Sequence, residues 1–204
     1  MDIVLGVLLA AVVWRIMCVK YQRRRIALLG SHLSGLQLER HMATLTEGYL
    51  RAISADTESR QLQVLETFAQ TERALAAQVR TLARSMQKEG TQATRMSVLR
   101  ACVPHIERVL PAVTRDLRAL LEIHAEGLRH VVDNEKNLEP KDRAFCLSAE
   151  LFLFQHSCHW FCKSRGVADA RLILSHKVDY QKVLDSVSDV TRSAYLKWLG
   201  GERL

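Results

Sequence analysis

Residues that break helices or close tight turns are scarce in this chain. Its 204 residues include nine glycines and three prolines, and no Asn-Gly or Asp-Gly pair is present. Because such pairs close the commonest β-hairpins, hairpin-rich β structure is disfavoured. Apolar and charged fractions of 48% and 25% argue against widespread disorder. We therefore predict an all-α protein, long enough for one domain beside a short membrane segment.

A disulfide framework is also missing. The cysteines number five, an odd count, and no framework spacing relates Cys18 to Cys102, Cys146, Cys158 and Cys162. We expect the thiols to be reduced, as is typical of the cytoplasm. We also expect them to be buried as small apolar side chains.

Known catalytic and nucleotide-binding motifs are absent from the sequence. Gly30 and Gly35 are not followed by Gly-Lys-Ser/Thr, so no phosphate-binding loop is predicted. A di-iron bundle needs two Glu-x-x-His pairs, and the spacing of Glu122, Glu126 and His130 does not provide them. The residues indicate no reaction and no substrate, and a non-enzymatic role is favoured.

One long apolar run is present, near the start of the sequence. It extends from Ile3 to Val19 with Arg15 as its single charge, and its 17 residues span about 26 Å as a helix, at the short end for a bilayer. Arg15 is near enough to the end to reach the headgroups. A signal peptide is the competing interpretation, but Asp2 replaces the usual positive charge and no small-x-small cleavage site follows. We predict a retained anchor in residues 1–25, leaving open whether it spans the membrane or lies on it.

Basic residues follow the apolar run immediately. Lys20, Arg23, Arg24 and Arg25 lie on this side, whereas Asp2 lies on the other. The positive-inside rule then predicts a single-pass protein of the inner (cytoplasmic) membrane, with its N-terminus outside and its domain in the cytoplasm. The same four side chains are candidates for binding anionic lipid headgroups.

The net charge of +7 is concentrated at this membrane edge. Residues 1–25 hold five basic groups against one acidic group, and the rest of the chain holds 24 basic and 21 acidic groups. A nearly balanced remainder is typical of a solvated surface, so nucleic-acid binding is not expected.

Helical periodicity continues through residues 26–204, which we predict to form a single helical bundle. We expect a flexible or kinked joint at residues 30–35, where two glycines interrupt the pattern. A helix from an N-cap at Asp56 to Glu89 is predicted by a broad apolar seam. That seam comprises Leu62, Leu65, Ala69, Ala76, Val79, Ala83 and Met86.

The second half of the chain predicts further helices. Pro104 and Pro111 favour a short or broken helix before a longer one resumes at Ala112. Another helix is predicted from Pro140 to Lys163, ended by Gly166. Shorter helices are expected in "ADARLIL", over 179–187, and from residue 188 onward.

The stretch "QHSCHWFCKSRG" is the one candidate for a metal or thiol site. Helical spacing places Cys158, His159 and Cys162 on one arc of about 100°, where they are able to supply two or three zinc ligands. His156 points away from them. Because the surrounding helix is apolar nearly all round, we interpret these residues chiefly as core, with zinc binding or a reactive cysteine as the alternative.

Three polar side chains are predicted on apolar faces. His124 lies in the stripe of its helix, His156 lies on the most apolar face of the next, and Glu150 lies within "SAELFLF". A carboxylate there needs water, Arg143, or a buried partner such as His124.

Three functions remain open. The favoured one is a membrane-tethered helical interaction or scaffold module that binds an unknown cytoplasmic protein, through the helix at 58–88 or through exposed aromatics in the C-terminal "YLKWLGGERL". The alternatives are a metal- or thiol-dependent sensor or enzyme, and a binder of anionic lipid or nucleic acid. Formation of a homo-oligomer through the alanine-rich seam is compatible with all three.

Overall fold

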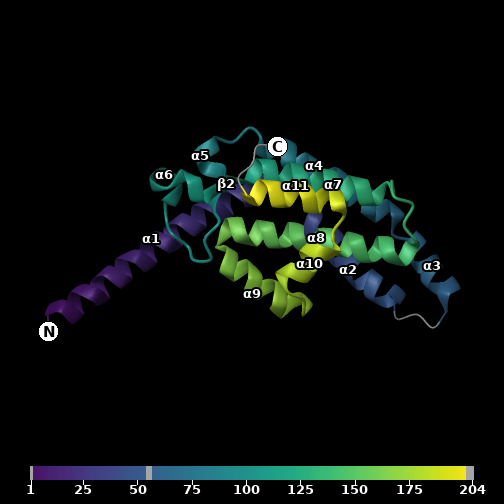
Figure 1. Ribbon diagram of the computed structural model, residues 1–204, viewed down its shortest axis with the longest axis horizontal. Helices are drawn as coiled ribbons and strands as arrows, with labels where there is room; N and C mark the ends of the chain where they lie inside the picture. The colour runs from purple at the N-terminus through teal and green to yellow at the C-terminus, as the bar shows by residue number, and fades with distance from the viewer. Residues whose placement is uncertain (1, 54–56, 201–204) are drawn as a thin grey trace.

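The centre of the molecule is α8 (Pro140–Cys162), the helix predicted from the apolar run after Pro140. In the computed structural model, which describes residues 2–53 and 57–200, this helix is contacted by helices from both halves of the chain. Other helices lie on both sides of α8 (Figure 1). Burial on nearly every side explains why its sequence lacks a polar face. Helices dominate the described residues, which confirms the all-α prediction.

The remaining elements in the part of the chain that the structure describes are helices apart from one short ribbon. They are α1 (Asp2–Leu33), α2 (Leu38–Ile53), α3 (Glu58–Glu66), α4 (Ala69–Met86), α5 (Thr91–Thr94), β1 (Arg95–Ser97), α6 (Ile106–Val109), the 3₁₀ helix η1 (Pro111–Val113), β2 (Thr114–Asp116), α7 (Leu117–Val132), α9 (Arg165–His176), α10 (Tyr180–Ser186) and α11 (Asp189–Gly200).

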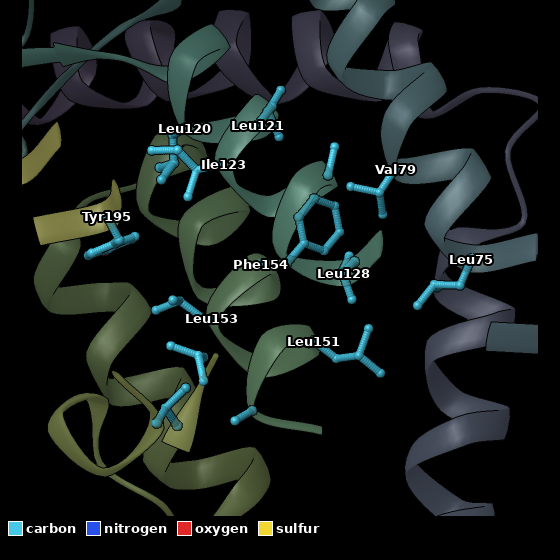
Figure 2. Packing of buried hydrophobic residues seen from close by; sticks show 14 of the residues in the cluster. Leu75, Val79, Leu120, Leu121, Ile123, Leu128, Leu151, Leu153, Phe154 and Tyr195 are labelled. Carbon is cyan, nitrogen blue, oxygen red and sulfur yellow. The ribbon is translucent and has the colours of Figure 1, made fainter. Parts of the chain in front are cut away.

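The main core lies between α4, α7 and α8. Leu75 and Val79 of α4 face Leu128 of α7, while Leu151 and Phe154 enter from α8 (Figure 2). All five side chains are buried. The apolar seam of α4 therefore packs into the bundle, as its spacing predicts.

The helix predicted from Asp56 to Glu89 is two helices, because the chain breaks at Thr67 and Phe68 between α3 and α4. The Phe68 ring packs edge-on against Tyr49 with centroids 5.9 Å apart, and it lies so close to Gly48 that a Cβ there would be 2.1 Å from Phe68 Cζ. This tertiary contact overrides the helical periodicity. The predicted N-cap at Asp56 lies outside the described residues, and Thr57 caps α3 by accepting from Arg60 N.

A two-stranded antiparallel ribbon of β1 and β2 was not predicted from the sequence. Arg95 pairs with Asp116 and Ser97 with Thr114. Strands of three residues are too short to show the period-two pattern that identifies a strand. The predicted short helix between the prolines is present as α6.

The C-terminal part forms the predicted short helices α9, α10 and α11. Gly166 does not end α8, however, since it lies in the first turn of α9, where its N–H donates to Arg100 O at 2.9 Å. Tyr195 and Trp198 of α11 are 0% and 4% exposed. The prediction of an exposed aromatic docking end is therefore wrong for these two residues, and 201–204 lie outside the described residues.

The N-terminal helix α1 is continuous, so the joint expected at residues 30–35 falls at its far end, where Gly35 has φ +87°. Its first half stands clear of the rest of the molecule (Figure 1). The segment Ile3–Leu33 is, by length and composition, the one helix among the described residues that is able to cross a membrane. In the second half of α1, Cys18, Tyr21, Arg25 and Leu29 are buried at helical spacing, which places one face of this helix on the bundle.

Candidate functional site

A largely apolar groove of about 640 Å³ lies where α1, α2 and α8 meet. Ile26, Leu29 and Leu33 line it from α1, and Met42 and Phe152 line it from α2 and α8. Its volume is within the range of sites that bind organic ligands or partner side chains. The groove is open beside Gly30, where an added Cβ would meet no atom within 4 Å.

Polar groups border this groove. Glu39 and Glu47 lie on exposed positions of α2, two helical turns apart. On the other wall the His176 ring stacks on Phe152 with centroids 3.9 Å apart, and its Nε2 donates to Gln155 Oε1 at 2.8 Å. The groove therefore combines an apolar floor with an acidic rim on one side, where Arg51 lies 3.6 Å from Glu47 and offsets part of its charge.

The predicted metal cluster, Cys158, His159 and Cys162, lies in the wall of the same groove. His159 Nδ1 accepts from Arg171 Nη1 at 3.1 Å, so one ring nitrogen is engaged with a cation. Burial raises the pKa of Cys158 well above its usual range, and burial raises the pKa of Cys162 to about 11. The described residues contain no group of three or more His, Cys, Asp or Glu side chains placed to hold a metal ion.

These environments favour neutral thiols, whereas a zinc ligand or a nucleophile is a thiolate. The arrangement thus fits packing in the wall of the groove better than zinc binding or thiol chemistry.

Glu150 is buried as predicted, but its partners differ from those expected. Its Oε1 accepts from Ser188 N at 3.1 Å and from Ser188 Oγ at 2.8 Å. A Cβ on Gly127 would lie 1.8 Å from Thr191 Oγ1 and 3.0 Å from Glu150 Oε2, so glycine is required where α7 passes this group. Burial raises the pKa of Glu150 to about 7, against the opposing hydrogen bonds from Thr191 and Ser188.

Neither partner considered for Glu150 from the sequence is in contact with it. Arg143 binds Glu72 Oε2 at 2.8 Å, and Glu72 also accepts from Tyr49 Oη at 2.5 Å. Arg143, Glu72 and Tyr49 form a polar cluster that was not predicted from the sequence. The position of Glu72, which interrupts the apolar seam of α4, was the signal that could have revealed it.

His124 is fully buried, and its Nε2 lies 2.9 Å from Ser157 Oγ. Because the Ser157 hydroxyl donates to Leu153 O at 2.9 Å, it accepts from His124. A nucleophilic serine would instead donate to its histidine. Burial lowers the pKa of His124 to about 3, and the pair is a neutral core contact.

His156 is also buried, with Nε2 2.9 Å from Asp169 Oδ1, and Asp169 Oδ2 lies 3.6 Å from Arg100. Burial lowers the pKa of His156 although Asp169 opposes the shift. Asp169 has no signal in the sequence that identifies it as a partner, because α9 follows α8 through a reversal that periodicity does not reveal.

The four basic residues predicted at the lipid headgroups separate into two groups. Lys20, Arg23 and Arg24 are exposed, but Arg25 is 8% exposed and donates to Phe161 O at 3.1 Å and to Arg95 O. The assignment of Arg25 to lipid is therefore corrected: it lies on the face of α1 that packs on the bundle. Arg25 follows Tyr21 by four residues, about one helical turn, and this spacing was the signal in the sequence that both lie on one face of the helix.

No protein-family model, curated protein or solved structure matches this chain. The functional argument therefore depends on the geometry described above.

Proposed function

We propose that this protein is a membrane-tethered helical module facing the cytoplasm, and that its groove binds an amphipathic helix of another cytoplasmic protein. The observation that carries the proposal is the groove itself, because α1 supplies both the apolar segment and one wall. A bound partner would thus be held next to the membrane.

The dimensions of the groove support a helical ligand. The α8 residues that line it extend from Phe152 to Cys162, which is about 15 Å of helix. A helix of about ten residues would lie along this length and place apolar side chains at i, i+3, i+4 and i+7 on the floor. The acidic rim at Glu39 and Glu47 favours a partner helix with basic residues at its edge.

Site-specific photo-crosslinking in native membranes tests this proposal. A photoreactive amino acid at Ala43, an exposed alanine in the groove, should give an adduct with one discrete protein. The same probe at Ala77, an exposed alanine of α4 outside the groove, is the matched control.

A second pair of variants tests whether the groove is the binding site. Gly30→Trp should place a large side chain in the groove, since a Cβ at residue 30 meets no atom within 4 Å, and should remove the adduct at residue 43. Gly90→Trp makes the same change at another glycine with open space around its Cβ position. Equal adducts at residues 43 and 77, or an adduct that persists in Gly30→Trp, would refute the proposal.

A further inference from the structure

A second apolar surface is formed by residues 108–112, which we call the tip. Val109 is 76% exposed and Leu110 is 53% exposed, and Pro111 and Ala112 are exposed beside them. Consecutive apolar residues that a fold leaves uncovered mark a contact surface more often than single exposed side chains do.

This tip is fixed beside the point where the apolar segment of α1 ends. Tyr21, two residues past Val19, donates from Oη to Glu107 Oε2 at 2.8 Å, and its ring packs against His105 with centroids 5.1 Å apart. Val109 is two residues from Glu107. Figure 1 shows α6 beside α1, at the end of the bundle from which the first half of α1 projects.

The surroundings of the tip are basic. Arg24 and Arg108 line a hollow of about 390 Å³ between α1, α5 and α6. Lys20 and Arg23 are exposed on the adjoining turns of α1. The one carboxylate in the lining of that hollow, Glu107, is 7% exposed and accepts from Tyr21, which leaves the accessible charge positive.

We propose that residues 108–112 form a second membrane contact, in which Val109 and Leu110 enter the headgroup region of an anionic bilayer while Arg24 and Arg108 lie against lipid phosphates. Apolar residues flanked by arginines are the chemistry of interfacial membrane contacts. Together with α1, this contact fixes the orientation of the bundle on the membrane surface. The inference rests on the proposed membrane anchor.

Lipid crosslinking of the full chain tests it. The protein is reconstituted in vesicles of phosphatidylcholine containing phosphatidylserine, with a photoreactive amino acid at residue 109, at residue 8 of α1, or at Leu62 of α3. Leu62 is an exposed leucine of α3, and Figure 1 shows α3 at the opposite end of the bundle. We expect lipid adducts at residues 8 and 109 that exceed those at residue 62 several-fold.

The outcomes separate this inference from the anchor. Adducts at residue 8 without adducts at residue 109 overturn the second contact and leave the anchor intact. Absence of adducts at both positions overturns the anchor as well. An adduct at residue 109 with a second protein copy in place of lipid also overturns the inference.

The role of charge is tested by Arg24→Gln with Arg108→Gln. These variants should lower the adducts at residue 109 several-fold in vesicles containing phosphatidylserine and leave those at residue 8 unchanged. Unchanged adducts at residue 109 would overturn the assignment of the two arginines to lipid phosphates.

Discussion

At the residue scale, Glu150 makes a prediction about the pH dependence of stability. Its pKa is about 7 in the fold against an ordinary value of 4.5. The folded state therefore retains a proton that the unfolded state loses between pH 4.5 and 7. Its stabilising contribution is present below pH 4.5 and is lost as pH rises through 7. Relative to the isosteric Glu150→Gln, the unfolding free energy of the wild type should fall by about 3 kcal/mol over this range.

Denaturant unfolding of both proteins at pH values between 4.5 and 7.5 measures this difference. Glu122→Gln, the same change at an exposed position of α7, is the matched control. A wild-type minus Glu150→Gln difference that does not change with pH would contradict the prediction.

The cysteines of the groove make a second prediction at this scale. Because burial raises the pKa of Cys162 to about 11 and that of Cys158 further, both thiols should react slowly with alkylating reagents at neutral pH. Peptide mapping of the alkylated protein should show both thiols modified slowly at pH 7, with Cys162 modified faster as pH rises toward 11. Rapid modification of either residue at pH 7 would revive the thiol hypothesis.

At the scale of elements, two glycines should respond to alanine with opposite signs. Gly30 lies inside α1 with open space around it, so Gly30→Ala should stabilise the helix by about 0.5–1 kcal/mol. Gly35 has φ +87°, so Gly35→Ala should destabilise the protein by about 1 kcal/mol or more. Thermal unfolding of the full chain in detergent compares them. Destabilisation by Gly30→Ala would contradict a helical conformation at residue 30.

Elements with long periodic sequences were predictable, and those that depend on distant contacts were not. The boundaries of α8 follow from Pro140 and from an apolar run that ends near Lys163. The break at Phe68 depends on Tyr49 and Gly48 in another helix. Similarly, burial of Glu150 and His124 was predictable from their apolar neighbours, but their partners Ser188 and Ser157 were not. The groove was not predicted either, because it requires the packing of three helices.

At the scale of the whole molecule, a buried cation contributes to the connection between the N-terminal helix and the bundle, beside the hydrogen bond from Tyr21 to Glu107. The Arg25 guanidinium donates to Phe161 O and Arg95 O, and it lies over the Tyr21 ring at 4.3 Å and the Phe161 ring at 4.8 Å. It thereby joins α1, β1 and the end of α8. If α1 anchors the protein as proposed, a rigid connection at this position would transmit the orientation of α1 to the groove and to the tip at 108–112.

Arg25→Ala should consequently destabilise the protein by about 2–3 kcal/mol, since it removes charged hydrogen bonds and leaves two carbonyl groups without their donor. Arg24→Ala, one residue earlier and exposed, should change the unfolding free energy by less than about 0.5 kcal/mol. Chemical unfolding of the full chain in detergent measures both values. Equal effects would mean that Arg25 contributes no more than Arg24 to holding α1 on the bundle, whereas a loss confined to Arg25→Ala would separate the arginine that packs on the bundle from its exposed neighbour.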